Sequence, residues 1–299
     1  MLKNFDELLP TNHYFLYNIR SMEYIIESDM GALDALRKLY PDSSRRSLQS
    51  WLKAGRFFID GKPLRKENET LLAGQTIRSQ DTFRPSKIPG LKILYQDRYF
   101  VVIDKPAGLL SVPLDEGKQS RHALGLLRQT LETNQIFAVH RIDRETSGVL
   151  LFARGKESED RFKDMFEKHD LTREYFAIVE GRLQDKSGTW EHRLLELPSL
   201  LVVASPEGKT ATTHYEVIRR SAKYSYIKLR LETGRKHQIR VHCQMAGHPV
   251  VGDQRYGAAE NPLKRLCLHA CKLEFQHPFT QKQMSFSSPL PGVFQALGA

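Results

Sequence analysis

Several features that mark secreted, membrane-bound or disulfide-stabilised proteins are missing from this chain. It contains no run of roughly 18 apolar residues, the length that a membrane-spanning helix needs. The N-terminus, MLKNFDELLP, has acidic residues where a secretory signal needs an apolar core. Cysteine is scarce, with 3 residues in 299, and an odd number does not indicate a disulfide framework. We therefore expect a cytoplasmic protein with reduced thiols and no membrane partner.

Motifs for common cofactors and metal ions are missing as well. No P-loop, dinucleotide-binding glycine pattern or nucleophile elbow is present. His237, His242 and His248 lack the spacing of an HExxH zinc site, and the CLHAC run at 267–271 offers too few spaced ligands. The apolar surroundings of CLHAC favour a buried strand. We predict chemistry that needs neither a cofactor nor a metal ion.

Positive charge is what the chain has in excess. The formal net charge is +10 and the pI is about 9.4. Such a charge attracts a polyanion through phosphate contacts and counterion release, although it can also serve solubility alone. The length of 299 residues exceeds the common domain size of roughly 100–150 residues, so we expect two domains.

A first domain is predicted over residues 22–80. The run EYIIES is typical of a strand, and GALDALRKLY has the apolar spacing of a helix. A second helix, RRSLQSWLKAG, is expected to begin after PDSS, where Asp42 or a following serine can cap it, and to end at Gly55. The next segment predicts short strands joined by an Asp60-Gly61 turn.

One side of this first domain is predicted to be basic. In the second helix Leu48, Trp51 and Leu52 share a face that should pack on the core. The segment resembles the S4 RNA-binding domain, which couples a Ser-Arg-Arg helix start to a Gly-containing hairpin and a final Gly-Asp/Gln-x-Ile strand. The resemblance implies RNA binding by Arg45, Arg46, Lys53, Arg56 and Lys62. A solvated basic face without a binding role is the alternative interpretation.

A larger domain is predicted over residues 91–296, beyond a proline-containing linker at 81–90. Short apolar runs such as KILYQDRYFVVIDKP, GVLLFAR and YSYIKLRLETG alternate with turns and with helical segments such as SEDRFKDMFEKHD. We predict an α+β fold around a long, mostly antiparallel sheet that is large enough to hold a deep cleft.

The run HRIDRETSG, residues 140–148, is the richest candidate for a functional loop. Asp143 lies near Arg141 and Arg144, which would keep its carboxylate ionised and ready to act as a nucleophile or base. Gly148 supplies an unusual backbone angle before a buried strand. A surface loop of paired charges has the same composition, so this turn by itself does not identify a site.

A second candidate is the segment LETGRKHQIRVHCQMAGHP. We predict a helix that begins after Gly234 and ends at Gly247. Gly234 would leave the N-terminus of that helix open to a phosphate. His237, Arg240 and Gln244 have the spacing of residues on one helical face. This face is therefore predicted to be functional, and the opposite face to be packed.

Four ordered motifs together resemble the RluA family of pseudouridine synthases: DKPAG at 104–108, HRIDRETSG at 140–148, REYFAIVEG at 173–181 and the run GRKHQIRVH…GHPVVGDQRYG. The resemblance covers residues 92–288 and, with the S4-like domain, is closest to members that modify large-subunit ribosomal RNA. It implies a pseudouridine synthase domain with a mixed sheet and a central cleft. It also implies that uracil leaves C1′ of a flipped uridine, turns, and rejoins through C5.

The same resemblance implies roles for individual residues. Asp143 would be the catalytic aspartate, Arg240 would pair with it, and Tyr175 would stack on the extracted base. Arg141 would fill the gap that the base leaves, and Leu268 would lie on the floor of the cleft. The other substrate-binding residues would be His140, Thr146, Gly148, Arg235 and His237. The aspartate could attack the sugar, attack the base or remove a proton.

The expected activity is therefore that of an isomerase acting on uridine in structured RNA, with RNA as its partner. Three alternatives fit the same residues. Transfer RNA could replace ribosomal RNA as the substrate, or the protein could be a catalytically silent binder of ribosomal RNA. A base N-glycosylase would also need base flipping and a carboxylate at the glycosidic bond. We further expect a monomer.

Overall fold

The structure, a computed structural model, describes residues 23–41, 43–53, 55, 57–79, 87–88, 91–113 and 121–298. The chain divides into two compact units, Met1–Arg84 and Pro85–Ala299. Some predicted features lie outside the described residues, namely the helix cap Asp42, the basic residue Arg56 and most of the linker at 81–90.

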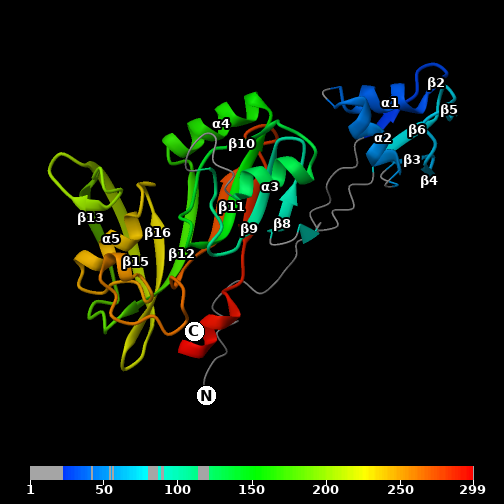
Figure 1. Cartoon of the computed structure of the whole chain (residues 1–299). Coiled ribbons are helices and arrows are strands. Elements are labelled where there is room, and N and C mark those ends of the chain that lie inside the picture. The colour runs from blue at the N-terminus through cyan, green and yellow to red at the C-terminus, as the bar shows by residue number, and fades with distance from the viewer. Residues whose placement is uncertain are drawn as a thin grey trace. The chain divides into compact units, whose positions relative to one another are not determined.

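The first unit combines two helices with two small antiparallel sheets (Figure 1). Its elements are β1 (Glu23–Ile25), β2 (Met30–Gly31), α1 (Ala32–Leu39), α2 (Arg45–Lys53), β3 (Phe57–Ile59), β4 (Lys62–Leu64), β5 (Thr70–Leu71) and β6 (Thr76–Ser79). One sheet has the order β1-β6-β3-β4, and β2 pairs with β5. Asp60 and Gly61 have φ angles of 47° and 80°, as a tight turn between β3 and β4 requires.

The second unit is built on one long sheet. Its strands are β7 (Lys87–Ile88), β8 (Leu91–Gln96), β9 (Phe100–Lys105), β10 (Ile136–Ala138), β11 (Ser147–Arg154), β12 (Leu171–Glu180), β13 (Ser187–Glu196), β14 (Val202–Ala204), β15 (Lys209–Arg220), β16 (Tyr224–Leu231), β17 (Leu268–Gln276) and β18 (Gln283–Ser287). Its helices are α3 (Ala123–Thr130), α4 (Lys156–Glu167) and α5 (Gln238–Met245), with short 3-10 turns η2 (Gln254–Tyr256) and η3 (Gly292–Leu297).

The strand order of this sheet is β14-β13-β15-β16-β12-β17-β11-β9-β8-β7, with β10 beside β11 and β18 beside β17. Among the described strands only the pairing of β11 with β17 is parallel. The sheet is therefore mixed and mostly antiparallel, and the predicted α+β class is confirmed. The parallel pair lies next to β12, at the middle of the sheet.

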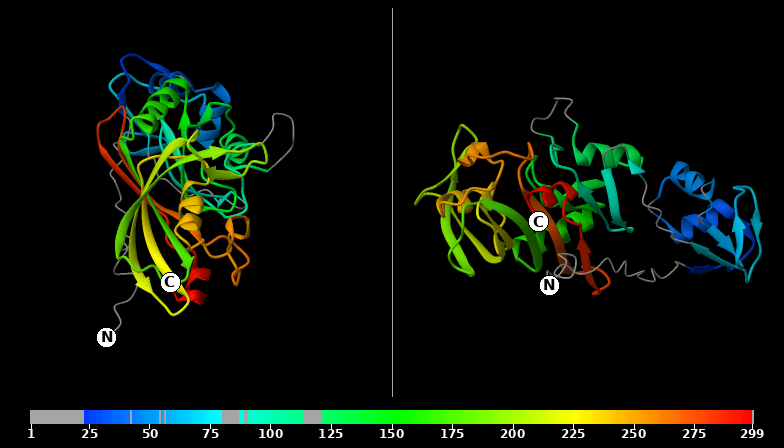
Figure 2. Two further views of the ribbon diagram at one scale, coloured as in Figure 1. Left: turned by 90° about the vertical axis from the view of Figure 1, so that its left-hand side faces the viewer. Right: turned by 90° about the horizontal axis from the view of Figure 1, so that it is seen from below.

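The helices pack against different parts of the sheet. α3 and α4 lie beside β10 and β11, whereas α5 lies on β13, β14 and β15 (Figure 1). The strands twist strongly along the sheet, as two further views show (Figure 2). Strands β12, β17 and β11 thus lie between two groups of helices, where loops from both sides can meet.

A hydrophobic core holds the middle strands rigid. Phe100, Phe162 and Leu151 are fully buried, and they pack in one cluster with Phe275 and Leu273 of β17. Burial of a side chain of this size stabilises the fold by roughly 1.5–3 kcal/mol. Because β11 is buried along almost its whole length, the loop that leads into it has a fixed end.

The helix predicted after Gly234 is shorter than expected. α5 begins at Gln238, and His237 before it has a left-handed backbone with φ of 54°. Gly234 therefore does not open a helix N-terminus, and that part of the prediction is wrong. The residues before the helix instead form a turn in which the Gln238 side chain accepts the backbone N–H of Arg235 at 3.0 Å. Gln244, which was predicted to share the functional face, is exposed and lies outside the cavity.

Candidate active site

A cavity of about 550 Å³ lies at the middle of the long sheet. Asp143 reaches it from the loop before β11, Tyr175 from β12, Leu268 from the start of β17 and Arg240 from α5. The other predicted residues on its wall are His140, Arg141, Thr146, Arg235 and His237. Four segments that are far apart in the sequence therefore converge on one site, and of the residues predicted in this unit Gly148 lies outside its lining.

Arg240 connects two carboxylates. Its Nε and Nη2 donate to the two carboxylate oxygens of Asp253 at 2.6 and 2.7 Å, and its Nη1 lies 3.4 Å from Oδ2 of Asp143. Arg240 and Asp253 are both buried, so this two-point ion pair fixes the guanidinium plane. The prediction from sequence included the pair of Arg240 with Asp143 but missed Asp253. In the sequence, the only local sign of a role for Asp253 was the place of this acidic residue between the apolar run VV and a turn.

The protonation of Asp143 is subject to opposing effects. Burial raises the pKa of its carboxyl, whereas Arg240, Arg141 and Lys105 favour the ionised form. The side chain keeps 24% of its surface exposed, so a substrate in the cavity can reach it. Arg144, the other arginine of the loop, donates instead to a backbone carbonyl at 3.1 Å.

His237 faces Asp143 from the start of α5. Its Nε2 lies 4.0 Å from Oδ2 of Asp143, and its Nδ1 lies 2.7 Å from the hydroxyl of Tyr256. Burial, together with the nearby Arg240, lowers the pKa of His237 to about 3, so the ring is neutral near pH 7. The phenol is the stronger donor of the pair, so we infer that the Tyr256 hydroxyl donates to Nδ1. The proton of the neutral imidazole is then on Nε2. His237 can then donate a hydrogen bond at the site but adds no charge.

Lys105 supports the loop that carries Asp143 through hydrogen bonds to backbone carbonyls. No role was predicted for this lysine from the sequence. Its side chain is fully buried, and Nζ donates to three backbone carbonyls at 2.7–3.1 Å, including that of Arg144. Burial lowers its pKa to about 7. Ser111 donates to the carbonyl of Ile142 at 2.7 Å. The backbone is therefore held on both sides of Asp143.

Tyr175 forms the wall beside the carboxylate. It lies on β12 where the pairing with β17 is irregular, and it is 8% exposed. Burial raises the pKa of its hydroxyl to about 12, and the charge of Asp143 acts in the same direction. The phenol therefore keeps its proton near neutral pH. It can donate a hydrogen bond and offer a ring for stacking, but it cannot act as the base.

His140 and Thr146 support the loop as well as lining the cavity. The N–H of Leu151 donates to Nε2 of His140 at 2.9 Å, and the imidazole stacks on Phe166 with ring centroids 4.4 Å apart. Burial lowers the pKa of His140 to about 3. Thr146 is buried, and its N–H donates to the carbonyl of Asp143 at 3.1 Å. Both residues fix the turn that presents the carboxylate.

Gly148 serves the backbone of the sheet. It has φ of 114°, and a Cβ added to it would lie 2.1 Å from the carbonyl oxygen of Ala270. The preceding residue, Ser147, has Oγ 2.9 Å from Nδ1 of His269 and accepts a bond from Arg265 at 2.8 Å. Gly148 therefore permits the close parallel pairing of β11 with β17, and its predicted contact with substrate has no support in the cavity lining.

The basic residues predicted in the first unit are placed on its surface. Arg45, Arg46 and Lys53 of α2 and Lys62 of β4 are exposed, while Leu48 and Leu52 are buried in the core of this unit. Exposure leaves these cations available to a polyanion.

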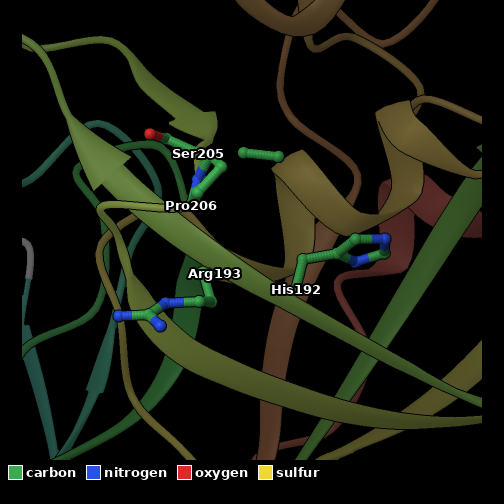
Figure 3. A pocket seen from close by; sticks show the side chains of 5 residues that line it. His192, Arg193, Ser205 and Pro206 are labelled. Atoms are coloured by element: carbon green, nitrogen blue, oxygen red, sulfur yellow. The ribbon is translucent and has the colours of Figure 1, made fainter.

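A second depression lies away from this cavity. It has a volume of about 320 Å³ and is lined by His192, Arg193, Ala204, Ser205 and Pro206. His192 and Arg193 are successive strand residues and point in opposite directions (Figure 3). This depression contains none of the predicted site residues and no carboxylate, so the cavity of Asp143 is the candidate active site.

Within the part of the chain that the structure describes, no three His, Cys, Asp or Glu side chains are grouped to hold a metal ion. Cys243, Cys267 and Cys271 are buried and free, and β17 contains the CLHAC run apart from its first residue. None of the described helices has the length and apolar character needed to cross a membrane.

Comparison with known proteins finds similarity along most of the chain. Residues 99–245 match the model of the RNA pseudouridylate synthase family. Curated relatives include the ribosomal large subunit pseudouridine synthase D of Neisseria meningitidis, which is 34% identical over 87% of this chain and 76% of that protein. The protein of the same name from Yersinia pestis is 32% identical over 89% of this chain and 90% of its own length.

Solved structures give the same result for the fold. Human RNA pseudouridylate synthase domain containing 1 aligns with a TM-score of 0.57 at 26% identity, over 69% of this chain and 86% of that chain. Human RNA pseudouridylate synthase domain containing 4 aligns with a TM-score of 0.56 at 23% identity, over 68% of this chain and 89% of that chain.

Proposed function

The chain belongs to the RNA pseudouridylate synthase family, and we propose that it modifies large-subunit ribosomal RNA with Asp143 as the catalytic carboxylate. An isomerase of this family converts uridine in RNA to pseudouridine. The names of the relatives support ribosomal RNA as the substrate, and transfer RNA is the alternative that an experiment must exclude.

The observation that carries the assignment of Asp143 is its position in the cavity. It is the one carboxylate of the described lining that lies on the HRIDRETSG loop, and Arg240 lies 3.4 Å from it. Glu167, the other acidic residue of the lining, is exposed on α4. A volume of about 550 Å³ is within the usual range for a small-molecule site of roughly 300–1,000 Å³ and suits one flipped nucleotide.

The isomerisation needs few chemical groups from the protein. The bond between C1′ and N1 breaks, a bond between C1′ and C5 forms, the proton at C5 is lost and N1 gains one. Atoms and electrons balance without an oxidant or a co-reactant. Attack on the sugar, attack on the base and removal of the C5 proton all use a carboxylate oxygen of Asp143. Tyr175 stacks on the base, and Arg240 with its fixed plane orients the carboxylate.

The first unit is proposed to act as an RNA-binding module of the S4 type over residues 22–80. The exposed cations Arg45, Arg46, Lys53 and Lys62, together with Arg56 outside the described residues, would contact phosphates. Residues 81–90 would be the linker and 91–296 the catalytic domain. We also propose that the protein works in the cytoplasm and that it is a monomer. Light scattering at micromolar concentration tests the monomeric state.

The test compares the wild-type protein with Asp143→Asn and with the control Asp185→Asn, which alters an exposed carboxylate on the turn before β13. Each protein is incubated with unmodified ribosomal RNA and transfer RNA transcripts, and pseudouridine is mapped. We expect specific sites in large-subunit ribosomal RNA for the wild type and the control. Asp143→Asn should reduce the rate by at least roughly 1,000-fold, as loss of one acid–base or nucleophilic group does.

Each other outcome contradicts a particular part of the proposal. Equal rates for Asp143→Asn and wild type would remove the role of Asp143. Pseudouridine in transfer RNA alone would replace the substrate. Release of free uracil would indicate an N-glycosylase, and absence of pseudouridine from every RNA would indicate a silent RNA-binding protein.

A further inference from the structure

Arg173 is a buried cation in the active-site cavity that the proposed chemistry does not use. It lies on β12 two residues before Tyr175, and both side chains line the cavity. Residues two apart on a strand point to the same face, so the guanidinium and the phenol share one wall. Arg173 is only 8% exposed, which is unusual for arginine.

The guanidinium of Arg173 is poorly satisfied by the protein. Its Nη2 donates to the backbone carbonyl of Glu232 at 3.1 Å, while its Nε is buried and has no hydrogen-bond partner. Among the described residues no carboxylate lies within ion-pair distance of it, in contrast to Arg240, which holds both oxygens of Asp253. A buried charge without a counter-ion is unfavourable, and burial accordingly lowers the pKa of Arg173.

The absence of a side chain at Gly234 leaves space for the guanidinium of Arg173. A Cβ added to Gly234 would lie 2.6 Å from Nη1 of Arg173. Any other residue at 234 would therefore have to move the guanidinium. The open helix terminus expected at Gly234 is not present, because α5 begins at Gln238. Gly234 instead leaves space for Arg173, and both residues line the cavity through which an anion could reach the guanidinium.

The other neighbours of Arg173 hold it without neutralising it. Its guanidinium carbon lies 5.8 Å from the centroid of the Phe166 ring, which stacks on His140. His140 is uncharged near neutral pH, because its pKa is lowered to about 3 by burial and by Arg173 itself. The wall formed by Phe166, His140 and Arg173 thus presents one positive charge and two aromatic surfaces.

We propose that Arg173 binds a phosphate of the RNA backbone next to the flipped uridine, and so positions the nucleotide for the chemistry at Asp143. This inference rests on the proposed function. A uridine held between Tyr175 and Asp143 brings its own 5′ and 3′ phosphates into the cavity. A guanidinium is the side-chain group best suited to phosphate oxygens, and phosphate contacts fix register without reading sequence.

The experiment removes the charge from either partner. The substrate is the shortest ribosomal RNA hairpin in which the wild-type protein forms pseudouridine, made with a single uncharged methylphosphonate at each position around the target. The proteins are wild type, Arg173→Met, Arg173→Lys and the control Arg182→Met, an exposed arginine on the turn after β12. KM and kcat are measured for each pair of protein and RNA.

For the wild type we expect one methylphosphonate beside the target uridine to raise KM by roughly 10- to 100-fold, the effect of removing one charge-assisted hydrogen bond. Arg173→Met should raise KM on unmodified RNA by a similar factor, with a smaller change in kcat, and should be insensitive to that methylphosphonate. Arg173→Lys should recover part of the affinity, and Arg182→Met should behave as wild type.

Gly234→Ala provides an independent variant, because it displaces the guanidinium without removing it. It should raise KM and reduce the methylphosphonate effect at the same position. If Arg173→Met keeps the full methylphosphonate effect at every position, Arg173 has a structural role or contacts the base, and the proposal is overturned. Unfolding curves for each variant exclude general loss of structure as the cause.

Failure of the proposed function gives a different result. Binding of uridine 3′,5′-bisphosphate, followed by NMR, needs no turnover. Weaker binding to Arg173→Met than to wild type, without pseudouridine formation by either, would leave the phosphate site in place and remove the function. Equal binding by the two proteins would overturn the phosphate site.

Discussion

Several residues of the candidate active site are buried in surroundings that disfavour their charged forms. Asp143 and Lys105 are both disfavoured in their charged forms by burial, and each is partly compensated by the other and by nearby groups. Arg240 is compensated more fully, because Asp253 binds it at two points. Because burial is compensated to a different extent at each residue, single substitutions can test how each group is protonated.

Arg141→Gln should move the acidic limb of the rate profile of Asp143. Arg141 is exposed, and its charge lowers the pKa of Asp143 against the larger effect of burial. If the carboxylate acts in its ionised form, removal of Arg141 raises that pKa further, and the limb shifts to higher pH. Single-turnover rates between pH 5 and 9 at saturating enzyme give the limb. The same shift in Arg144→Gln, whose guanidinium bonds a backbone carbonyl, would contradict a specific effect of Arg141.

Lys105→Met should remove a pH dependence of stability. Burial lowers the pKa of Lys105 to about 7 from 10.5, so between these values the unfolded chain binds a proton that the native protein lacks. The contribution of Lys105 therefore becomes more favourable as pH rises through this window, by at most about 1.4 kcal/mol per pH unit. Urea unfolding at several pH values should show this slope in the wild type and in the control Lys92→Met, an exposed residue, but not in Lys105→Met. Parallel curves for all three proteins would contradict it.

The sequence predicted the residues that line the cavity better than the residues that hold them in place. Asp143, Tyr175 and Arg240 belong to recognisable motifs, and the structure brings them together. Asp253 and Lys105 act through contacts with residues 13 and 39 positions away, and no local pattern encodes such pairs. The lysine at the end of the apolar run FVVIDK was nonetheless a signal, because a strand that ends in the core must satisfy its charge.

At the scale of elements, the pairing of β11 with β17 decides the position of the loop that carries Asp143. Local sequence indicated both strands but gave no partner or direction for either, because strand pairing depends on contacts distant in sequence. The glycine at the start of β11 was noted for its backbone angle, yet its closeness to Ala270 follows only from the parallel register of Gly148 with that residue. The same holds for α5, whose helical spacing was visible while its true start at Gln238 was not.

Gly148→Ala should therefore destabilise the protein and reduce its activity. The added methyl group would meet the carbonyl of Ala270 at 2.1 Å and would also occupy a backbone conformation with φ of 114°. We expect a decrease of about 3 kcal/mol or more in the free energy of unfolding. Gly257→Ala is the matched control, because Gly257 has φ of 87° with nothing within 4 Å of an added Cβ. Its decrease should be only about 1–2 kcal/mol, and equal decreases in denaturant unfolding would argue against the close contact.

At the scale of the whole molecule, positive charge is unevenly divided. Residues 1–84 contain 13 Lys and Arg against 11 Asp and Glu, so the first unit contributes +2 of the net charge of +10 and residues 85–299 contribute +8. Most of the general attraction for RNA is therefore expected from the second unit. What the first unit adds is a local group of cations on α2 and β4, which suits site choice more than bulk affinity.

Deletion of residues 1–84 should accordingly weaken binding to full-length ribosomal RNA and reduce site choice more than it slows the chemical step. The second unit has its own core and the complete cavity of Asp143, so its single-turnover rate at saturating RNA should stay within about threefold of wild type. A full-length variant with Arg45, Arg46, Lys53 and Lys62 changed to Gln tests the same idea without deletion. For this variant we measure the association constant for RNA at several salt concentrations. The slope of its logarithm against the logarithm of salt concentration should become shallower by up to about 0.7–0.9 for each phosphate that the variant no longer neutralises. Unchanged binding and site choice in both proteins would show that the basic residues of α2 and β4 form a solvated face without a role in RNA recognition.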